Sequence, residues 1–487
     1  MMNKSRNIVI LFTIFILIIT GCQNQNKKVD GVKPNIIFIL TDDQGYGDLS
    51  AHGNPFLKTP NMDCLFEESA RFTNFVVSPT CSPTRCALMT GKHEFRSGVT
   101  HTVAGRREMS LQSTTVAQVL KSAGYATGIF GKWHLGSNGE YRPEKRGFDV
   151  SITTVDDTQH SHFDPVLLFN GVEKQTHGFR ENILFDEAMQ FIELNKDRPF
   201  FCYIPTYSPH APLRAPQEYI DKNNGNVFYA MISNIDDNIG RLMKKLKKLQ
   251  LDDNTVVILM NDNGGTWGVD NYNAGMRGCK GTVWYGGTRA FSFWRWPGHI
   301  KPGNIGNLAA HVDVLPTLAA LAGVRLSEKM ENELDGVNLL PLLKGETRTL
   351  SDRMVITHLG RWPDGPGEVK AHKYAFCSVH WNNYLLVKSQ TCGRNDCRGE
   401  CRVFQRVIEG STISGYSKNA GFHYAVDPQH KWALFDVYSD PAQCNDLALR
   451  FPEIVFKMSE AYEKWWTEVY PYIHREAEDP RWSQDFN

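Results

Sequence analysis

Two segments far apart in the chain share one pattern, and this pattern restricts the fold more than any other feature. Ile36–Leu40 is a continuous apolar run, and the polar segment TDDQGYGD follows it at once. Val256–Met260 repeats the arrangement and ends in NDNGG. A short, uninterrupted apolar run is typical of a strand that is buried on both faces, as in a parallel sheet covered by helices.

Two further apolar segments end in polar side chains that carry chemistry. ATGIFGKWHLG leads to Lys132 and His134, and PFFCYIPTYSPHAP leads to His210. Helical patterns lie between these segments, at Thr114–Ala123, Glu181–Leu194 and Val227–Leu249. The alternation of strands and helices predicts an α/β sheet, whose ligands bind beyond the carboxyl ends of the strands. We therefore expect the polar clusters to converge on one cleft.

The polar clusters at the two strand ends suggest a metal site only when they are taken together. Each alone has the composition of an ordinary turn. Together, Asp42, Asp43, Asp262 and Asn263 form a set of oxygen donors. Three adjacent carboxylates repel one another unless a cation lies among them. Hard oxygen ligands that include an amide carbonyl favour Ca²⁺ over Mg²⁺, which retains waters in strict octahedral geometry.

The overall charge and the cysteines narrow the class of protein. Lys and Arg number 53, and so do Asp and Glu, so no global field attracts nucleic acid. The 487 residues exceed one compact core. Of the 11 cysteines, Cys392, Cys397 and Cys401 crowd one stretch. The spacing favours a disulfide-braced loop over a zinc site, which usually shows paired C-x₂-C spacings.

The first residues have the pattern of an export signal. Lys4 and Arg6 precede the apolar run Ile8–Ile19, which is shorter than the roughly 20 residues that span a membrane. Thr20-Gly21-Cys22 resembles the bacterial lipobox, and this resemblance implies that residues 1–21 are removed and Cys22 is lipidated. We expect an exported protein held in the cell envelope, in the periplasm or at the outer membrane, with residues 22–33 as a polar tether.

The segment CSPTRCALMTG, which begins at Cys81, resembles the C-x-P-x-R signature of the type I sulfatase family. Six motifs stand in the order found in that family: TDDQGYGD, CSPTR, GKWHLG, SPHAPL, NDNGG and RGCKGTVWYGGTR. The resemblance runs from about Pro34 to the C-terminus. It implies an α/β fold of the alkaline-phosphatase-like kind, with a mixed sheet sandwiched by helices. We expect a catalytic domain over 34–345 and a smaller α+β domain with an antiparallel sheet over 346–487.

The resemblance also implies a sulfatase, that is, a sulfuric ester hydrolase, with a modified cysteine. In the family a maturation enzyme oxidises this cysteine, here Cys81, to formylglycine (3-oxoalanine), and Pro83 would preset the turn that this enzyme reads. The aldehyde hydrate has two hydroxyls: one attacks sulfur, and the other, once deprotonated, expels sulfate. A thiolate already attacks well, but its sulfate adduct has no easy route to break down.

Family roles are carried over position by position. Modified Cys81 would join Asp42, Asp43, Asp262 and Asn263 as Ca²⁺ ligands. In the catalytic set, Arg85 would hold the formylglycine hydrate, and Lys132 and Lys280 would contact sulfate oxygens. His134 would take the proton of the second hydroxyl. His210, together with Lys280, would protonate the leaving alcohol. These roles make physical sense, because charge develops on sulfate oxygens and a sugar alkoxide leaves poorly without an acid.

The substrate is the least constrained expectation. Tyr285 in VWYGGTR stands where many family members carry a glutamate, and we expect it to affect the surroundings of the cleft rather than activity. His160, His162, Arg361 and Trp362 are candidates for substrate binding, since an aromatic ring and cations suit a polyanionic sugar. We expect a sulfated carbohydrate, with algal fragments such as ulvan ahead of glycosaminoglycan or mucin.

Other activities share parts of this pattern. A phosphonate monoester hydrolase can also carry formylglycine, and a phosphodiesterase or phosphatase of the same superfamily binds metals at strand ends. Two-metal members need additional histidine and aspartate ligands, and no convincing second set is present in the sequence. A lipoprotein that only binds glycans has no use for a complete maturation signature together with His134, His210 and Lys280.

Overall fold

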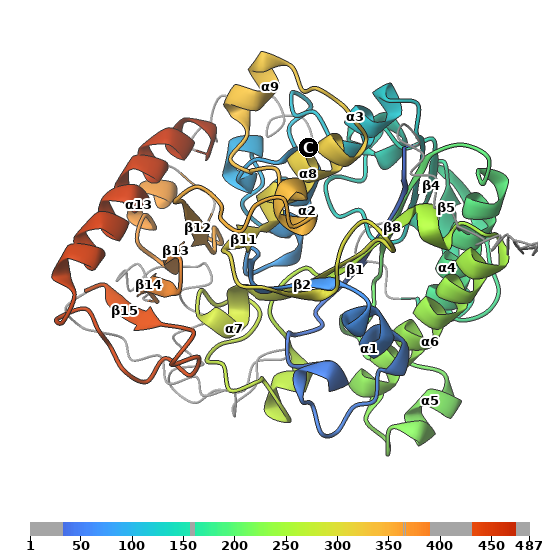
Figure 1. Cartoon of the computed structure of the whole chain (residues 1–487), viewed down its shortest axis with the longest axis horizontal. Helices are drawn as coiled ribbons and strands as arrows, with labels where there is room; N and C mark the ends of the chain where they lie inside the picture. The colour runs from blue at the N-terminus through green and yellow to red at the C-terminus, as the bar shows by residue number, and fades with distance from the viewer. Residues whose placement is uncertain (1–32, 156–160, 364, 366, 390–430, 474–487) are drawn as a thin grey trace, which may run out of the picture. The chain divides into compact units, whose positions relative to one another are not determined.

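The computed structural model describes residues 33–155, 161–363, 365, 367–389 and 431–473 (Figure 1). Its main feature is a sheet of eleven strands in the order β10-β2-β9-β8-β1-β7-β3-β4-β5-β6, with β11 paired to β2. The strands are β1 (Asn35–Thr41), β2 (Ala70–Val76), β3 (Ala126–Phe130), β4 (Val150–Thr154), β5 (Val166–Phe169), β6 (Val172–Gln175), β7 (Phe200–Pro205), β8 (Thr255–Asn261), β9 (Arg289–Arg295), β10 (Gly303–Ile305) and β11 (Ala309–Ala310).

The sheet is mixed, with a parallel centre. β1 runs parallel to β7 and β8, and β3 runs parallel to β7 and β4. β9 is antiparallel to both β8 and β2, so β2 points the same way as the central strands. The carboxyl ends of β1, β2, β3, β7 and β8 therefore meet at one edge of the sheet.

Helices cover both faces of the large sheet. The helices are α1 (Pro60–Glu67), α2 (Cys81–Thr90), α3 (Val116–Ser122), α4 (Arg180–Leu194), α5 (Gln217–Lys222), α6 (Val227–Lys248), α7 (Tyr285–Thr288), α8 (Val314–Leu321), α9 (Glu328–Glu333), α10 (Leu340–Leu343), α11 (Glu368–Ala371) and α13 (Pro452–Ile473). In β1, Ile36, Phe38 and Leu40 pack with α2, α3 and α8, whereas Ile37 and Ile39 pack with α1, α4 and α6. Alternate residues of a buried strand serve opposite faces, which explains its unbroken apolar run.

A second, antiparallel sheet lies in the C-terminal part of the chain. Its order is β12-β13-β14-β15, with β12 (Met354–His358), β13 (Cys377–Trp381), β14 (Tyr384–Lys388) and β15 (Ala433–Asp436). Helix α13 packs on this sheet through Tyr462, Trp465 and Trp466. The expected fold class is thereby confirmed. The predicted domain boundary at 345/346 falls between the two sheets and remains a prediction.

Several expectations fall on residues that the structure does not describe. These are the N-terminal signal with Cys22, the tether up to residue 32, His160, and the cluster of Cys392, Cys397 and Cys401. Cys64 and Cys86 are among the described cysteines that carry free thiols. Within the described part of the chain, no helix has both the length and the apolar character needed to cross a bilayer.

Candidate active site

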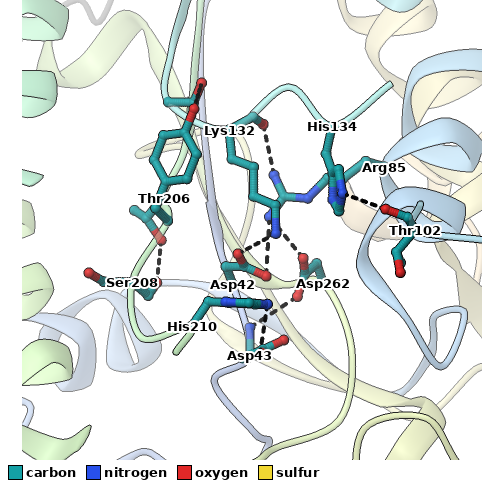
Figure 2. A network of polar contacts seen from close by, with 12 residues as sticks. Asp42, Asp43, Arg85, Thr102, Lys132, His134, Thr206, Ser208, His210 and Asp262 are labelled. Carbon is teal, nitrogen blue, oxygen red and sulfur yellow. Dashed lines mark hydrogen bonds and ion pairs between the residues drawn. The ribbon is translucent and has the colours of Figure 1, made fainter. Parts of the chain in front are cut away.

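Strand pairing brings the predicted aspartates together. Thr41 of β1 lies opposite Asn261 of β8, so Asp42 and Asp262 leave the sheet side by side. The backbone N–H of Asp43 donates to Oδ1 of Asp262 over 3.2 Å. Asp43 has a φ of 67°, in the left-handed region that aspartate tolerates better than most residues. The convergence expected from the two polar strand ends is therefore observed (Figure 2).

Cys81 is the first residue of α2, which follows β2 at the same edge of the sheet. Pro83 lies in the first turn of this helix, and its role in maturation stays a prediction. Proline fits there since the first backbone N–H groups of a helix have no acceptor within it. Cys81 is buried, and Arg85, four residues later, shares its helix face.

Arg85 is a fully buried cation that joins three of the strand ends. Its Nη2 donates to Oδ2 of Asp262 over 2.8 Å, and its Nη1 donates to the carbonyl of Lys132 over 3.0 Å. Burial alone would lower the pKa of Arg85, but Asp262 and Asp42 raise it above its usual value. Arg85 therefore remains charged.

Lys132 provides a second buried cation. Its Nζ donates to Oδ2 of Asp42 over 2.7 Å (Figure 2). Burial alone would lower the pKa of Lys132, but Asp42 keeps it above its usual value. Gly131 allows this placement, because a Cβ there would lie 1.9 Å from the carbonyl oxygen of Pro205. The GKWH motif therefore needs its glycine for close approach to β7.

Lys280 supplies the third cation from a loop that precedes α7. Its Nζ donates to Oδ1 of Asp43 over 2.5 Å, and its backbone N–H donates to the carbonyl of Gly265 over 3.0 Å. The next residue, Gly281, donates its N–H to the carbonyl of Pro79 over 2.8 Å. Lys280 is thus held between the loop after β8 and the chain leading to Cys81.

Two histidines complete the site from β3 and β7. His134 has a φ of 58°, and its Nε2 lies 3.1 Å from the carbonyl oxygen of Thr102. His210 places Nε2 3.7 Å from Oδ2 of Asp43, while its Nδ1 lies 2.6 Å from the carbonyl oxygen of Ala211. Burial lowers the pKa of both histidines, and for His210 the charge of Asp43 opposes that effect.

The oxygen donors fit a cation. Ligand atoms of Asp42, Cys81 and Asp262 all lie within 4.8 Å of one another. Among the described residues, Oδ1 of Asp42 and Oδ1 of Asn263 are buried without a hydrogen-bond donor. Burial and the negative charge of Asp42 raise the pKa of Asp262 to about 7. A cation bound there would relieve this repulsion and satisfy the bare oxygens. Asp43 lies slightly apart and holds Lys280 and Nδ2 of Asn263.

The candidates for substrate binding differ in their positions. Arg361 is half-buried, and its Nη2 donates to Oγ1 of Thr102 over 3.4 Å, next to His134. Trp362 is only 2% exposed and packs edge-on against Phe95. His162 is 3% exposed and stacks on Phe179. Both rings are therefore used in packing, and a role for Trp362 or His162 in substrate binding stays a prediction.

Tyr285 is also part of a packed core. It is buried beneath the guanidinium of Arg289, whose Cζ lies 4.9 Å from the ring centre. Its backbone N–H donates to Oε1 of Gln443 over 2.9 Å. Tyr285, at the start of α7, thus connects the chain after Lys280 to the segment that follows β15.

Two groups that support the site were not predicted from the sequence. Thr102 receives His134 through a backbone carbonyl, which no side-chain pattern reveals. Ser78, three residues before Cys81, donates to Oε1 of Glu94 over 2.6 Å and lies 2.9 Å from Nε2 of His311. All three side chains are buried. Only the proximity of Ser78 to the cysteine motif gave a signal in the sequence.

The assembled groups are suited to the hydrolysis of an anionic ester. Arg85, Lys132 and Lys280 direct positive charge toward one small volume beside Cys81. Such preorganised cations stabilise charge that develops on the oxygens of a transferred group. His134 and His210 lie at different strand ends and provide two separate sites for proton transfer.

Comparison with known proteins identifies relatives of this arrangement. A family model described as Sulfatase matches residues 34–324. Arylsulfatase A of Homo sapiens is 33% identical over 400 residues, covering 71% of this chain and 76% of its own. N-acetylgalactosamine-6-sulfatase of Homo sapiens is 32% identical over 446 residues, covering 82% of this chain and 81% of its own. The crystal structure of Ps i-CgsB in complex with k-i-k-neocarrahexaose is 25% identical, with a TM-score of 0.75, over 93% of this chain and 97% of that one.

Proposed function

The chain belongs to the sulfatase family, and on that basis we propose that it removes sulfate from a sulfated carbohydrate by means of a formylglycine at position 81 and a bound calcium ion. Membership confirms the family and the class of enzyme, a sulfuric ester hydrolase, that were expected from the ordered motifs. The observation that carries the proposal is the placement of Cys81 at the start of α2 beside Arg85, Lys132 and Lys280.

The modified cysteine and the metal fit the residues present. When formed, the formylglycine hydrate supplies the attacking hydroxyl and a second hydroxyl through which sulfate is released. When bound, Ca²⁺ supplies a fixed positive charge that draws electron density from the sulfate group. Asp42, Asp262, Asn263 and residue 81 would hold the ion, and Asp43, which contacts Lys280 through Oδ1, would join them.

The cations of the chain bind and orient the sulfate. Lys132 and Lys280 are each anchored by one aspartate, at 2.7 and 2.5 Å, and both ammonium groups have further donors for sulfate oxygens. Arg85 is fixed between Asp262 and the carbonyl of Lys132. Because Arg85 and Lys132 are buried and the side chain of Lys280 is only 14% exposed, their charges act in a region of low dielectric constant and stabilise an anionic transition state.

His134 is positioned to accept a proton. Its Nε2–H donates to the carbonyl of Thr102, which fixes the tautomer with the lone pair on Nδ1. The pKa of His134 is lowered by burial and then by Lys132, so the ring is neutral. A neutral imidazole in a fixed tautomer acts as a base.

His210 is positioned to donate a proton to the leaving alcohol. Its Nδ1–H donates to the carbonyl of Ala211, which leaves Nε2 directed toward Asp43. Burial lowers the pKa of His210, whereas the negative charge of a bound sulfate ester would favour the protonated ring. A sugar alkoxide is a poor leaving group and needs such an acid.

The chemistry of the relatives supports a carbohydrate. The related N-acetylgalactosamine-6-sulfatase is named for a sugar sulfate, and the related Ps i-CgsB is seen with a neocarrahexaose. We infer that the substrate is a fragment of an algal polysaccharide, of ulvan, carrageenan or porphyran type, ahead of a glycosaminoglycan or mucin. Arg361, beside Thr102 on the His134 side, is the described candidate for contacting a further anionic group of such a chain.

The enzyme would act at the cell envelope. The lipobox-like Thr20-Gly21-Cys22 supports export and a lipid anchor at Cys22, which would hold the enzyme in the periplasm or at the outer membrane where oligosaccharides arrive. A maturation enzyme that converts Cys81 is the second partner this proposal requires, whereas the neutral net charge gives no support for nucleic acid.

A phosphonate monoester hydrolase or a phosphodiesterase is the alternative. Two-metal phosphatases need a second set of ligands. Within the part of the chain that the structure describes, Asp42, Cys81 and Asp262 form the one group of three such side chains close enough to share an ion. A single-metal formylglycine enzyme therefore agrees best with the site.

The test is desulfation of a panel of defined sulfated oligosaccharides by the enzyme co-expressed with a maturation enzyme. Peptide mass spectrometry of residue 81 accompanies it, together with assays of a phosphonate monoester and a phosphodiester. We expect formylglycine at position 81 and sulfate release from an algal oligosaccharide. Faster turnover of the phosphorus esters, or of an aryl sulfate over every sugar, would refute the proposal.

Metal removal tests the ion separately. A chelator should abolish activity and lower the melting temperature by several degrees, because the carboxylates of Asp42 and Asp262 would then repel each other. Added Ca²⁺ should restore both properties better than Mg²⁺. Full activity with an unchanged melting temperature in excess chelator would exclude this metal site.

A further inference from the structure

The active site opens to solvent on one side. The side chains of Arg85, Asp42 and Lys132 are 1–4% exposed, whereas those of Lys280 and His210 are 14% and 34% exposed. The sulfate group must lie among the buried cations, so the remainder of the ester projects outward past His210 and Lys280. The sugar that carries the leaving oxygen therefore binds against the surface around these two residues.

Trp267 begins a short helix, η6 (Trp267–Asp270), in the loop that follows β8. Its neighbour Thr266 donates through Oγ1 to the carbonyl of Asp43 over 3.4 Å. One residue earlier in the chain, Gly265 accepts the backbone N–H of Lys280 over 3.0 Å. Adjacent Cα atoms are only about 3.8 Å apart. Trp267 is therefore one residue from a contact with Asp43, which faces His210, and two residues from a contact with Lys280.

The side chain of Trp267 is accessible to solvent. Gly268 and Val269 are buried, whereas Trp267 is 39% exposed. It is the only exposed tryptophan among those the structure describes, since the others are buried or half-buried. No hydrogen bond, stacked ring or cation contact involves this indole within the described residues. An aromatic surface of this size beside a catalytic opening is available to a ligand.

We propose that Trp267 forms the stacking surface for the sugar ring that bears the scissile sulfate, and so determines the preference for carbohydrate esters. The inference rests on the proposed function. The apolar C–H face of a pyranose matches an indole plane, and tryptophan loses little conformational freedom on binding because it has two side-chain torsions. Binding energy gained there, away from sulfur, would be used to hold the leaving oxygen against His210.

The experiment uses the full-length, matured enzyme and the sulfated oligosaccharide that the wild type hydrolyses best. Trp267→Ala should lower kcat/KM about 10-fold, chiefly by raising KM, because it removes a stacking contact and no reacting group. Trp267→Phe should retain activity within about threefold, since it keeps an aromatic face. Tyr438→Ala, which removes another exposed aromatic ring, is the matched control and should behave as wild type.

Inhibition by inorganic sulfate separates stacking from a structural role. Sulfate occupies only the buried pocket, so its inhibition constant should stay within about twofold in Trp267→Ala. A parallel weakening of sulfate inhibition would show that Trp267 supports the pocket and would overturn the proposal. If Trp267→Ala hydrolyses the oligosaccharide as fast as the wild type does, the stacking role of Trp267 is wrong while the proposed function stands. If the wild type hydrolyses no sugar, the proposed function fails, and this inference fails with it.

Discussion

Two regions of the molecule are equally well buried but are built in opposite ways. At the carboxyl edge of the large sheet, Asp42, Asp262, Arg85 and Lys132 are buried charges packed against one another. Where the C-terminal part meets the rest of the chain, the core consists of aromatic side chains. The ring centre of Phe95 lies 5.8 Å from that of Trp465 and 5.5 Å from that of Trp362.

The contrast shows that the charged region of the active site contributes less to stability than the aromatic region. Buried charge pairs recover little of the free energy lost on leaving water, so the first region is weak evidence for stability. Aromatic burial contributes favourably through apolar area and ring contacts. The two regions meet at His93 and Glu94: His93 contacts the ring of Trp465 at 4.7 Å, and Glu94 accepts from Ser78, close to Cys81.

The largest effect should follow from removing the proposed nucleophile. Cys81→Ala should reduce sulfate release about 10⁶-fold, as removal of the nucleophile does in other hydrolases, while the melting temperature stays close to that of wild type. Cys86→Ala is the matched control on the same helix and should remain active. Sulfate release by Cys81→Ala above a trace would show that the charged region does not use residue 81.

The effect of losing His210 should depend on how good the leaving group is. His210→Ala should slow hydrolysis of a sugar sulfate about 10²- to 10⁴-fold and affect an activated aryl sulfate much less, because a good leaving group needs no proton. Comparison of kcat for the two substrates measures this difference. Equal losses on both would indicate that His210 binds sulfate rather than protonating the alcohol.

The aromatic region should respond in stability rather than in catalysis. Trp465→Ala should lower the free energy of unfolding by about 3–5 kcal/mol, because the ring is buried in a packed core. Activity per folded molecule should be unchanged at low temperature. Phe456→Ala, on the same helix with its ring 67% exposed, should change stability by less than about 0.5 kcal/mol. Loss of activity at unchanged stability in Trp465→Ala would contradict this separation.

The smallest effect concerns Glu94, which lies where the charged and aromatic regions meet. Burial alone would raise the pKa of Glu94, but His93, His311 and Ser78 lower it from 4.5 to about 2. A depressed folded-state pKa contributes stability above pH 4.5 that is lost as the pH falls toward 2, here about 3 kcal/mol.

Glu94→Gln tests this value. The substitution should destabilise the protein at neutral pH and flatten its stability between pH 4.5 and pH 2, measured by chemical denaturation. Cys64→Ser, at an exposed thiol, is a control that should keep the wild-type profile. An unchanged slope in Glu94→Gln would show that the carboxylate contributes no such stability.

The sequence by itself determined which strands are followed by candidate catalytic and metal-binding side chains. Ile36–Leu40 and Val256–Met260 had to be buried strands, and parallel neighbours necessarily present their carboxyl ends together, so the approach of Asp42 to Asp262 was predictable. The C-x-P-x-R spacing placed Arg85 four residues after Cys81. Local pattern is enough to identify each strand and the Cys81–Arg85 spacing because neither depends on distant contacts, whereas the pairing of β1 with β8 joins residues far apart in the chain.

Only the tertiary structure decided which of these side chains are buried and what they contact. An aromatic or histidine side chain carries no local mark of burial. The burial of the Trp362 and His162 rings was therefore not predictable, and Trp267 was overlooked although it lies exposed. The pairs Lys132–Asp42 and Lys280–Asp43 span 90 and 237 residues. Such contacts arise when the sheet and its loops assemble, and burial then sets their strength, because the low dielectric constant of the interior magnifies every charge.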